Sequence, residues 1–411
     1  MSEWFLRGWR RWFAIPLSLR FAVGVWVALL LGVFGRVAVS RPDQQSVVPI
    51  YLLAAKRLKA NENLYADPPP GLDIYRNPPA VAALFVPFTF LDPTLAAILW
   101  RLLGISLYLL GLRQLVRDVL PPLSPLRRAW VWLLSAVLVI PAFNNGQINL
   151  PIVATALLGT AAAARGAWKT AAVWLVIAGW FKVYTAAVGL LMSVAFPKLF
   201  FARFFVTGWL IVCGTWLGVE MWASVGQDWE VRREPLTDFV EASQGEDRSA
   251  APLERAPKDW SILVRVWFDV VVPKPVSLGV SLAVAVGMAL LLFLRGDRRE
   301  PATVAAPSGR REDAVFAPLA LGLLWLTLFG PATEMNTYSV LAPVAAVLCV
   351  VGRWQWVARF GTLMLVVAVV RGAFPNDERY PYHTQQALGA AVLFVAAVLV
   401  SPPRQQGASN Y

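Results

Sequence analysis

Histidine and cysteine are almost absent from this chain, which contains one histidine and two cysteines in 411 residues. The single histidine, His383, excludes a metal site built from several histidines. Cys213 and Cys349 lie in separate apolar stretches and show no Cys-x-x-Cys or Cys/His spacing. We therefore expect both cysteines to be buried packing residues rather than metal ligands.

Charged residues are also scarce, at 15% of the chain, whereas 58% of the residues are hydrophobic and the mean hydropathy is +0.58. A soluble protein of this length could not bury so much apolar surface, so the composition indicates a polytopic membrane protein. Several of the 19 tryptophans lie near the ends of predicted spans, where the membrane interface favours them. Apolar spans are predicted near residues 21–39, 94–115, 129–142, 149–164, 170–181, 183–197, 204–224, 275–294, 314–332, 338–352, 358–373 and 387–400.

The net charge of +12 suggests nucleic-acid binding at first sight, but the basic residues follow a membrane topology instead. Loops on the side of the N-terminus are rich in arginine, whereas the opposite loops carry more acidic than basic residues. This is the positive-inside pattern, with both termini cytoplasmic and an even number of crossings. We therefore expect no nucleic-acid partner. The arginines on the cytoplasmic side include Arg7, Arg10, Arg11, Arg127, Arg128, Arg295, Arg298, Arg299, Arg310 and Arg311.

The predicted organisation is a single all-α membrane domain over residues 1–411, with about 12 transmembrane helices. The first extracytoplasmic loop, residues 40–93, contains a helix-like segment at 47–59. It also contains an apolar piece at 80–90 that is too short to cross the bilayer and is interpreted as re-entrant or interfacial. A second extracytoplasmic loop covers 226–274. The cytoplasmic loop 295–313 is rich in Arg, Pro, Gly and Ser and is predicted to be flexible.

A run of amide side chains interrupts the apolar sequence at residues 144–149, which read Asn-Asn-Gly-Gln-Ile-Asn. Amides in or beside hydrocarbon are costly unless they find polar partners. A cluster of them at one membrane edge therefore predicts a polar cavity that binds a ligand, with Asn145, Gln147 and Asn149 in its wall.

Asp43 follows the first span by four residues and is a candidate general base. A carboxylate at the mouth of a helix bundle can accept a proton from a hydroxyl group. A solvated loop acid, or an N-cap for the helix that follows, explains the same residue without any catalytic role.

Two basic residues are candidates for binding a phosphate group. Lys182 interrupts the apolar sequence from 171 to 197 and is predicted to lie at an outer turn between two spans, where it could hold a phosphate as a point charge. A lysine that snorkels to the membrane interface is the alternative. Arg265, in an amphipathic return to the membrane that opens at Asp259, is the second candidate.

The run Pro331-Ala332-Thr333-Glu334-Met335-Asn336-Thr337-Tyr338 is another polar break on the predicted outer side. A short polar turn is the simple explanation. However, Glu334 has no basic neighbour in sequence, so any charged partner must come from elsewhere in the fold. Since all these polar groups fall on the outer side, we expect one shared extracytoplasmic cavity.

The chain resembles glycosyltransferase family 87, the polyprenol-phosphate-mannose-dependent mannosyltransferases of the C-type superfamily. The resemblance covers roughly residues 21–350 and depends on the order of several short motifs. Those motifs are Tyr51-Leu52-Leu53-Ala54-Ala55, Asn63-Leu64-Tyr65, Tyr75-Arg76-Asn77-Pro78-Pro79, Asn145-Gly146-Gln147-Ile148-Asn149-Leu150, Lys182, and Pro331-Ala332-Thr333-Glu334 with Tyr338.

The resemblance implies a lipid-phosphate-linked sugar donor, transfer with inversion, and no required metal or other cofactor. It also implies a base aspartate in the first outer loop, which here points to Asp43. Two positions differ from the family pattern. Asp43 precedes Tyr51 by eight residues instead of three or four, and Asp259-Trp260-Ser261 replaces the family's Asn-Gln-Ser.

Together these observations predict a C-type membrane glycosyltransferase in the cell membrane, acting on the extracytoplasmic side on a lipid or glycan acceptor. Asp43 is predicted to be catalytic, and Lys182 and Arg265 are predicted to bind the donor phosphate. The predicted substrate-binding residues are Tyr75, Asn77, Asn145, Gln147, Asn149, Glu334 and Tyr338. Two other functions stay open: a transporter or flippase of lipid-linked sugars, which the lack of an internal repeat disfavours, and a non-catalytic membrane scaffold.

Overall fold

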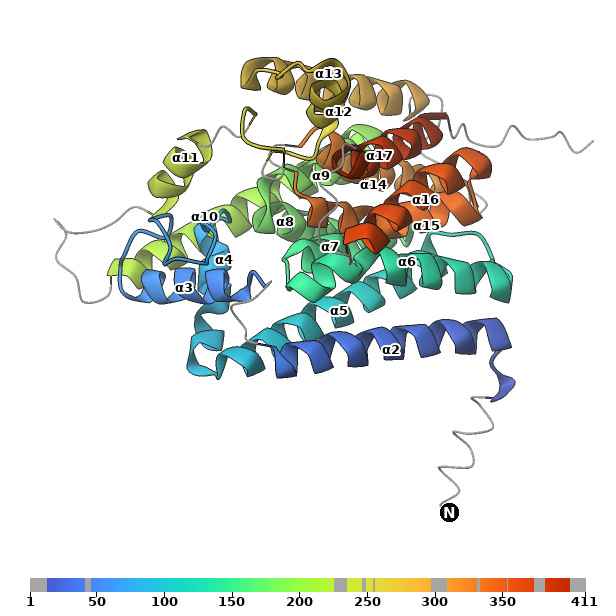
Figure 1. The fold of residues 1–411 in the computed structure, drawn as a ribbon. Helices are drawn as coiled ribbons and strands as arrows, with labels where there is room; N and C mark the ends of the chain where they lie inside the picture. Colours follow the sequence, from blue (N-terminus) through green and yellow to red (C-terminus); the bar gives the residue numbers. More distant parts are fainter. Residues whose placement is uncertain are drawn as a thin grey trace, which may run out of the picture.

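The computed structural model is built from helices (Figure 1). It describes residues 13–40, 46–224, 235–245, 249–253, 256–296, 309–330, 333–352, 354–372 and 381–399. The regular elements within these residues are all helical, which confirms the all-α prediction.

The first half of the chain forms a bundle with one long loop. Its helices are α2 (Leu17–Val39), α3 (Val48–Lys59), α4 (Pro79–Phe85), the 3₁₀ helix η1 (Val86–Phe90), α5 (Pro93–Asp118), α6 (Pro125–Asn145), α7 (Asn149–Ala164) and α8 (Trp168–Phe181). Helix α3 coincides with the segment predicted at 47–59. Asp92 caps α5 by accepting hydrogen bonds from the backbone N–H groups of Thr94 (2.9 Å) and Leu95 (3.2 Å), so the long helix restarts at Pro93 as the sequence indicates.

The second half adds shorter helices and completes the bundle. They are η2 (Val183–Thr185), α9 (Ala186–Ala195), η3 (Pro197–Phe201), α10 (Ala202–Ser224), α11 (Pro235–Gly245), α12 (Trp260–Phe268), α13 (Lys274–Gly296), α14 (Gly309–Leu328), η5 (Met335–Leu341), α15 (Ala342–Val350), α16 (Gln355–Gly372) and α17 (Pro381–Leu399). The predicted flexible loop 295–313 is therefore too long, because residues 295–296 and 309–313 are helical. Residues 297–308 lie outside the described part of the chain.

Among the residues that the structure describes, six helices are long and apolar enough to cross a membrane. They span Leu17–Val39, Pro93–Asp118, Pro125–Asn145, Pro197–Thr215, Lys274–Arg295 and Gln355–Gly372. Seven further apolar helices have 10–17 residues, and the total of about 12 crossings stays a prediction. The span predicted at 129–142 is part of a longer helix, since its polar flanks are also helical.

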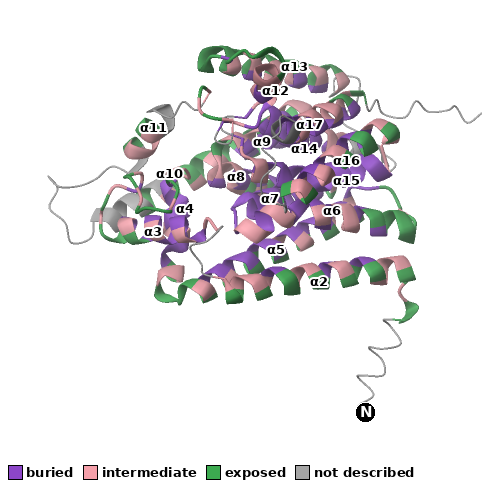
Figure 2. Cartoon of the chain, in the orientation of Figure 1, coloured by how far each residue is buried: buried purple, intermediate pink, exposed green. Residues whose placement is uncertain are grey.

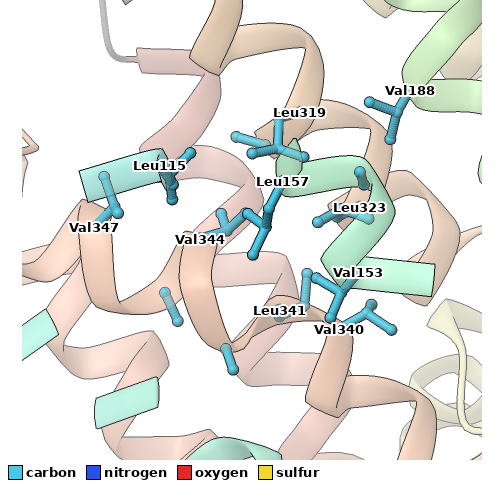
Figure 3. Packing of buried hydrophobic residues seen from close by; sticks show 14 of the residues in the cluster. Leu115, Val153, Leu157, Val188, Leu319, Leu323, Val340, Leu341, Val344 and Val347 are labelled. Atoms are coloured by element: carbon cyan, nitrogen blue, oxygen red, sulfur yellow. The ribbon is translucent and has the colours of Figure 1, made fainter. Parts of the chain in front are cut away.

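Helix α7 forms the centre of the bundle (Figure 2). Its residues are buried from Asn149 to Ala163, and small side chains let neighbouring helices approach closely. A Cβ atom at Gly111 of α5 would lie 3.0 Å from the Ala154 carbonyl oxygen. Figure 3 shows Val153 and Leu157 of α7 among leucine and valine side chains from α5, α9, α14, η5 and α15.

The outer helices of the bundle leave apolar side chains exposed. On α2 these include Phe21, Val27 and Leu31, and on α13 they include Leu282 and Leu290. Figure 2 shows exposed residues along both helices, on opposite sides of the molecule. Surfaces of this kind are expected to face lipid rather than water.

The two cysteines differ in burial. Cys349 on α15 is buried and lies 3.0 Å from the Thr362 hydroxyl oxygen, whereas Cys213 on α10 is only half-buried. The expectation of burial is thus confirmed for Cys349 alone.

The loop between α2 and α5 packs on one end of the bundle, which we call the loop end (Figure 1). Helices α3 and α4 pack against each other there, and α4 also contacts α10 and α11. An apolar cluster joins this loop to the bundle and includes Tyr51, Phe85, Trp100 and Ile148. The predicted polar groups must be located relative to this end.

Candidate active site

The amide run forms a tight turn between α6 and α7 at the loop end. Helix α6 ends at Gly146, whose backbone is left-handed with φ 69° and ψ 29°. The Gln147 N–H donates to the Ala142 carbonyl at 3.0 Å and closes the helix end. A Cβ atom at Gly146 would lie 2.9 Å from Val48 Cγ2 and 3.0 Å from Arg101 Cζ. Glycine is therefore required here both by conformation and by space.

Arg101 explains how this turn is held in place. Its side chain is only 3% exposed. The guanidinium donates from Nε to Phe143 O (3.2 Å), from Nη2 to Asn144 O (2.9 Å) and to Ser46 Oγ (3.1 Å), and from Nη1 to Ala97 O (3.0 Å). An arginine inside an apolar helix is thus satisfied by oxygen atoms of its own chain.

Two further contacts attach the amide turn to its surroundings. The Trp100 indole donates to the Gly146 carbonyl at 2.8 Å. The Val47 N–H donates to the Asn145 carbonyl at 3.1 Å, and the Ser46 hydroxyl approaches the same oxygen at 3.4 Å. The segment just before α3 is therefore fixed directly on the turn.

The amide side chains reach across the site to the late polar turn. Asn149 Nδ2 donates to Gln147 Oε1 at 2.6 Å and to Asn336 O at 3.3 Å. Gln147 Nε2 donates to Glu334 Oε2 at 3.4 Å. Gln147 and Asn149 are buried, whereas the Glu334 side chain is 41% exposed. Two motifs separated by 187 residues in the sequence thus meet in the fold.

Glu334 is fixed by the helix it begins. It caps η5 in a reciprocal arrangement with Thr337, whose hydroxyl accepts from the Glu334 N–H at 3.2 Å. Lys258 N donates to the Thr333 carbonyl at 2.7 Å, and Gln386 Nε2 donates to the Met335 carbonyl at 3.2 Å. Backbone groups on both sides of Glu334 are therefore held by other parts of the fold.

The first loop supplies the remaining side of the site. Arg76 Nη1 lies 4.0 Å from Glu334 Oε1 and 2.8 Å from Asp73 Oδ2. The Tyr51 hydroxyl accepts from the Ile148 N–H at 3.4 Å and is hydrogen-bonded by the Asn77 side chain. Burial raises the pKa of Tyr51 above its ordinary value, so this hydroxyl stays protonated. Amides, a carboxylate, a guanidinium and a phenol therefore share one polar cluster.

A comparison with known families decides what this cluster belongs to. The model of glycosyltransferase family 87 matches residues 75–309, which is more than half of the chain. The chain belongs to glycosyltransferase family 87. No curated protein matches it. Membership of this family, together with the apolar helices, makes the chain a multi-pass membrane glycosyltransferase.

The family match covers one part of the site and not the other. It includes Arg76, Gln147, Lys182 and Arg265, and it ends before Glu334. Asp43 precedes the match and also lies outside the residues that the structure describes.

The predicted residues Tyr75 and Tyr338 use their hydroxyl groups in backbone contacts rather than in the polar cluster. Both are buried. The Tyr75 hydroxyl donates to the Pro78 carbonyl at 2.9 Å, and the Tyr338 hydroxyl donates to the Lys258 carbonyl. Burial raises the pKa of the Tyr75 hydroxyl well above its ordinary value. These hydroxyls are therefore already used in holding the turns around the site.

The two predicted phosphate-binding residues have different environments. Lys182 ends α8, which confirms the predicted break, and its Nζ lies 5.7 Å from the centre of the Tyr184 ring. Phe181 belongs to the same apolar cluster as Ile148, so Lys182 is at the loop end. The Arg265 guanidinium donates to the Ser249 and Ala251 carbonyls at 3.0 and 2.6 Å. Arg265 thus fixes the segment before α12.

Asp259 is a buried acid next to this segment. It caps α12 by accepting hydrogen bonds from Ser261 N (2.8 Å) and Ser261 Oγ (2.6 Å). Burial raises the pKa of its carboxyl group despite these bonds. The residue that replaces the family's asparagine is therefore part of the local structure.

Sequence reasoning missed Tyr51 and Arg76 as members of the site. Both lie in motifs that carried the family resemblance, so their position in the first loop was the available signal. Within the described part of the chain, no group of three or more His, Cys, Asp or Glu side chains could hold a metal ion.

Proposed function

We propose that this enzyme transfers a hexose, mannose-like, from a polyprenyl-phosphate donor to a hydroxyl group of a lipid or glycan acceptor. The reaction inverts the anomeric carbon, requires no metal, and takes place on the extracytoplasmic face of the cell membrane, with both chain termini in the cytoplasm. The positive-inside pattern supports this orientation.

The observation that carries the proposal is the meeting of the amide turn, the first loop and the Glu334 turn at one end of a membrane bundle. Gln147, Asn149 and Glu334 lie in direct contact there, beside Arg76 and Tyr51. Hydrogen-bonding groups of this kind suit a sugar with several hydroxyls, and the surrounding apolar helices suit a lipid carrier.

In the proposed reaction, Asp43 removes the proton from the acceptor hydroxyl while its oxygen attacks the anomeric carbon. The bond between that carbon and the phosphate oxygen breaks, and the lipid phosphate leaves with the electron pair. Asp43 precedes Ser46 by three residues, and three residues of chain span at most about 11 Å. Because Ser46 contacts the amide turn, this tether supports the assignment of the base.

Lys182 and Arg265 are assigned to the charge that grows on the leaving phosphate. Asn77, Asn145, Gln147, Asn149 and Glu334 are assigned to orienting the sugar, with Tyr75 and Tyr338 supporting them. Amide groups are not bases at neutral pH, so the proton must go to a carboxylate. Glu334 is the alternative base because it is the partly exposed carboxylate that contacts the amides.

The test uses the purified protein in lipid vesicles with labelled polyprenyl-phosphate mannose and an extract of membrane lipids as acceptors. We expect the wild-type protein to transfer label into a new glycoside. The transfer rate should fall at least 100-fold in Asp43→Asn, the loss typical of removing a general base. Full transfer by a folded Asp43→Asn protein would show that the base is another group, and Glu334→Gln then tests the alternative.

A transporter or flippase would use the same polar cluster without chemistry. It would move the labelled donor across the vesicle membrane and leave the bond between sugar and phosphate intact. Recovery of all label as unchanged donor, with label redistributed between the leaflets, would overturn the enzyme proposal. A scaffold would do neither, and its polar site residues would tolerate alanine.

A further inference from the structure

Arg76 differs from the other basic side chains around the site in the type of partner that it has. Its guanidinium lies between two carboxylates, 2.8 Å from Asp73 Oδ2 and 4.0 Å from Glu334 Oε1. The Arg76 side chain is 27% exposed and Asp73 is 62% exposed. Part of the Arg76 side chain is therefore accessible to a ligand.

We propose that Arg76 is a ligand of the donor phosphate, and that the phosphate takes the place of Glu334 as a counter-ion of this arginine. This inference rests on the proposed function, because it names the group that recognises the lipid phosphate. It adds a phosphate ligand from the first loop to those predicted from the sequence.

The chemistry of the guanidinium supports the exchange. Its planar fork matches carboxylate and phosphate oxygens equally well. Arg76 is 4.0 Å from Glu334, which is beyond hydrogen-bond distance, so charge rather than a hydrogen bond holds this pair. A phosphate that binds Arg76 directly gains the hydrogen bonds that the Glu334 carboxylate does not make with this guanidinium.

The backbone around Arg76 is fixed, so the side chain is already in place. The Tyr75 hydroxyl donates to the Pro78 carbonyl at 2.9 Å, and the Tyr65 hydroxyl donates to the Asn77 carbonyl at 3.0 Å. The Tyr65 and Tyr75 rings also pack together, with centres 5.6 Å apart. A preorganised donor of this kind is most useful where charge develops during a reaction.

Other arginines of the loop end are less suited to this role. Arg101 is buried and donates to four oxygen atoms of the chain. Arg57 donates to two backbone carbonyls. A phosphate could bind Arg101 or Arg57 only by displacing carbonyls that would lose their partners, which is costly. Arg76 can instead exchange one anion for another.

Release of Glu334 also has a consequence for the sugar. Glu334 accepts from Gln147 Nε2, and Gln147 in turn accepts from Asn149. When phosphate occupies Arg76, the Glu334 carboxylate keeps its amide partner and loses its charge interaction with Arg76, which makes it a stronger hydrogen-bond acceptor for a sugar hydroxyl. Phosphate and sugar recognition are thereby coupled through one carboxylate.

The experiment measures binding of radiolabelled polyprenyl phosphate to the purified full-length protein, with the polyprenol of equal length as the phosphate-free probe. We expect Arg76→Gln to weaken binding of polyprenyl phosphate about 10- to 100-fold and to leave polyprenol binding unchanged. Arg76→Lys keeps the charge without the fork and should fall between the two. Arg117→Gln removes an exposed, ion-paired arginine on the far end of α5 and should bind like wild type.

The direction in which a second variant changes the affinity for polyprenyl phosphate shows whether Arg76 binds the ligand or only forms a structural ion pair. Glu334→Gln removes the competing anion and should tighten polyprenyl phosphate binding by about two- to fivefold, the range of a partly exposed pair. Equal weakening in Arg76→Gln and Glu334→Gln, or wild-type binding by Arg76→Gln, would overturn the proposal. If Arg76→Gln does not fold, as judged by gel filtration, Arg76→Lys carries the same comparison.

Binding and transfer can fail separately. A wild-type protein that binds polyprenyl phosphate through Arg76 but forms no glycoside contradicts the proposed function and supports the Arg76 assignment. A protein that transfers sugar while Arg76→Gln keeps full affinity contradicts only the assignment of Arg76.

Discussion

Arg101 and Arg76 border the same polar cluster, yet their surroundings assign them opposite roles. Arg101 is buried beneath the amide turn, and its guanidinium donates to three carbonyl oxygens and one hydroxyl oxygen of the chain. Arg76 is partly exposed at the rim and faces carboxylates. The type of partner, rather than the presence of a cation, therefore separates a structural arginine from one that can bind a substrate.

The largest contrast is expected when each arginine is replaced by methionine. Arg101→Met leaves the carbonyls of Phe143 and Asn144 without this donor in a buried site, so the free energy of unfolding should fall by about 3 kcal/mol or more. Arg76→Met removes a partly exposed pair and should change it by less than about 1 kcal/mol. Thermal unfolding in detergent, followed by circular dichroism, measures both.

Activity measurements should separate the two arginines by the cause of the defect. Arg76→Met is expected to be folded and impaired in donor binding, whereas Arg101→Met is expected to be impaired because the turn is lost. Equal stabilities for the two variants would mean that the carbonyl contacts of Arg101 contribute little to the stability of the fold. The distinction between a buried structural arginine and a partly exposed one would then fail.

Gly146, in the amide turn that Arg101 supports, gives a second test with a smaller expected loss of stability. Gly146→Ala places a side chain in a left-handed conformation and brings its Cβ within 3.0 Å of Val48 and Arg101. We expect a loss of about 1–3 kcal/mol in the free energy of unfolding, together with reduced transfer. Gly24→Ala is the matched control, because it lies on the exposed face of α2 with no atom within 4 Å.

Gly24→Ala should leave stability unchanged or slightly higher, since alanine favours a helix more than glycine does. If Gly146→Ala matched this control in both stability and transfer, the amide turn would tolerate rearrangement and could not fix the position of Gln147.

Much of the fold could be predicted because membrane helices leave a strong signal in sequence. The break at Lys182 was predictable, since a lysine within apolar sequence has to reach an interface, and α8 does end there. The end of α6 was less clear, because its polar flanks at 125–128 and 143–145 stay helical and periodicity alone does not include them.

The site was predictable in its parts and not in its contacts. The amides predicted a binding site because amide groups are costly beside hydrocarbon. In the structure, the side chains of Gln147 and Glu334 are in contact. Arg101 could not be assigned, since three of the four oxygen atoms that accept its hydrogen bonds come from α6 and from Ser46, 42 to 55 residues away in the sequence. Arg76 was likewise hidden, because its pairing with Glu334 depends on folding of the first loop.

Two buried tyrosines extend the same comparison from charge to hydroxyl groups, with the smallest expected effect. Tyr51 and Tyr338 are 5% and 4% exposed, and each uses its hydroxyl in one backbone hydrogen bond, with Ile148 N and Lys258 O respectively. Replacing either by phenylalanine should lower the free energy of unfolding by about 1 kcal/mol. The Tyr51 hydroxyl also contacts Asn77 in the polar cluster, so only Tyr51→Phe is expected to reduce sugar transfer, by about three- to tenfold. Initial rates at saturating donor measure this difference, and a larger loss in Tyr338→Phe would place the reacting groups nearer to η5 and α12 than to the first loop.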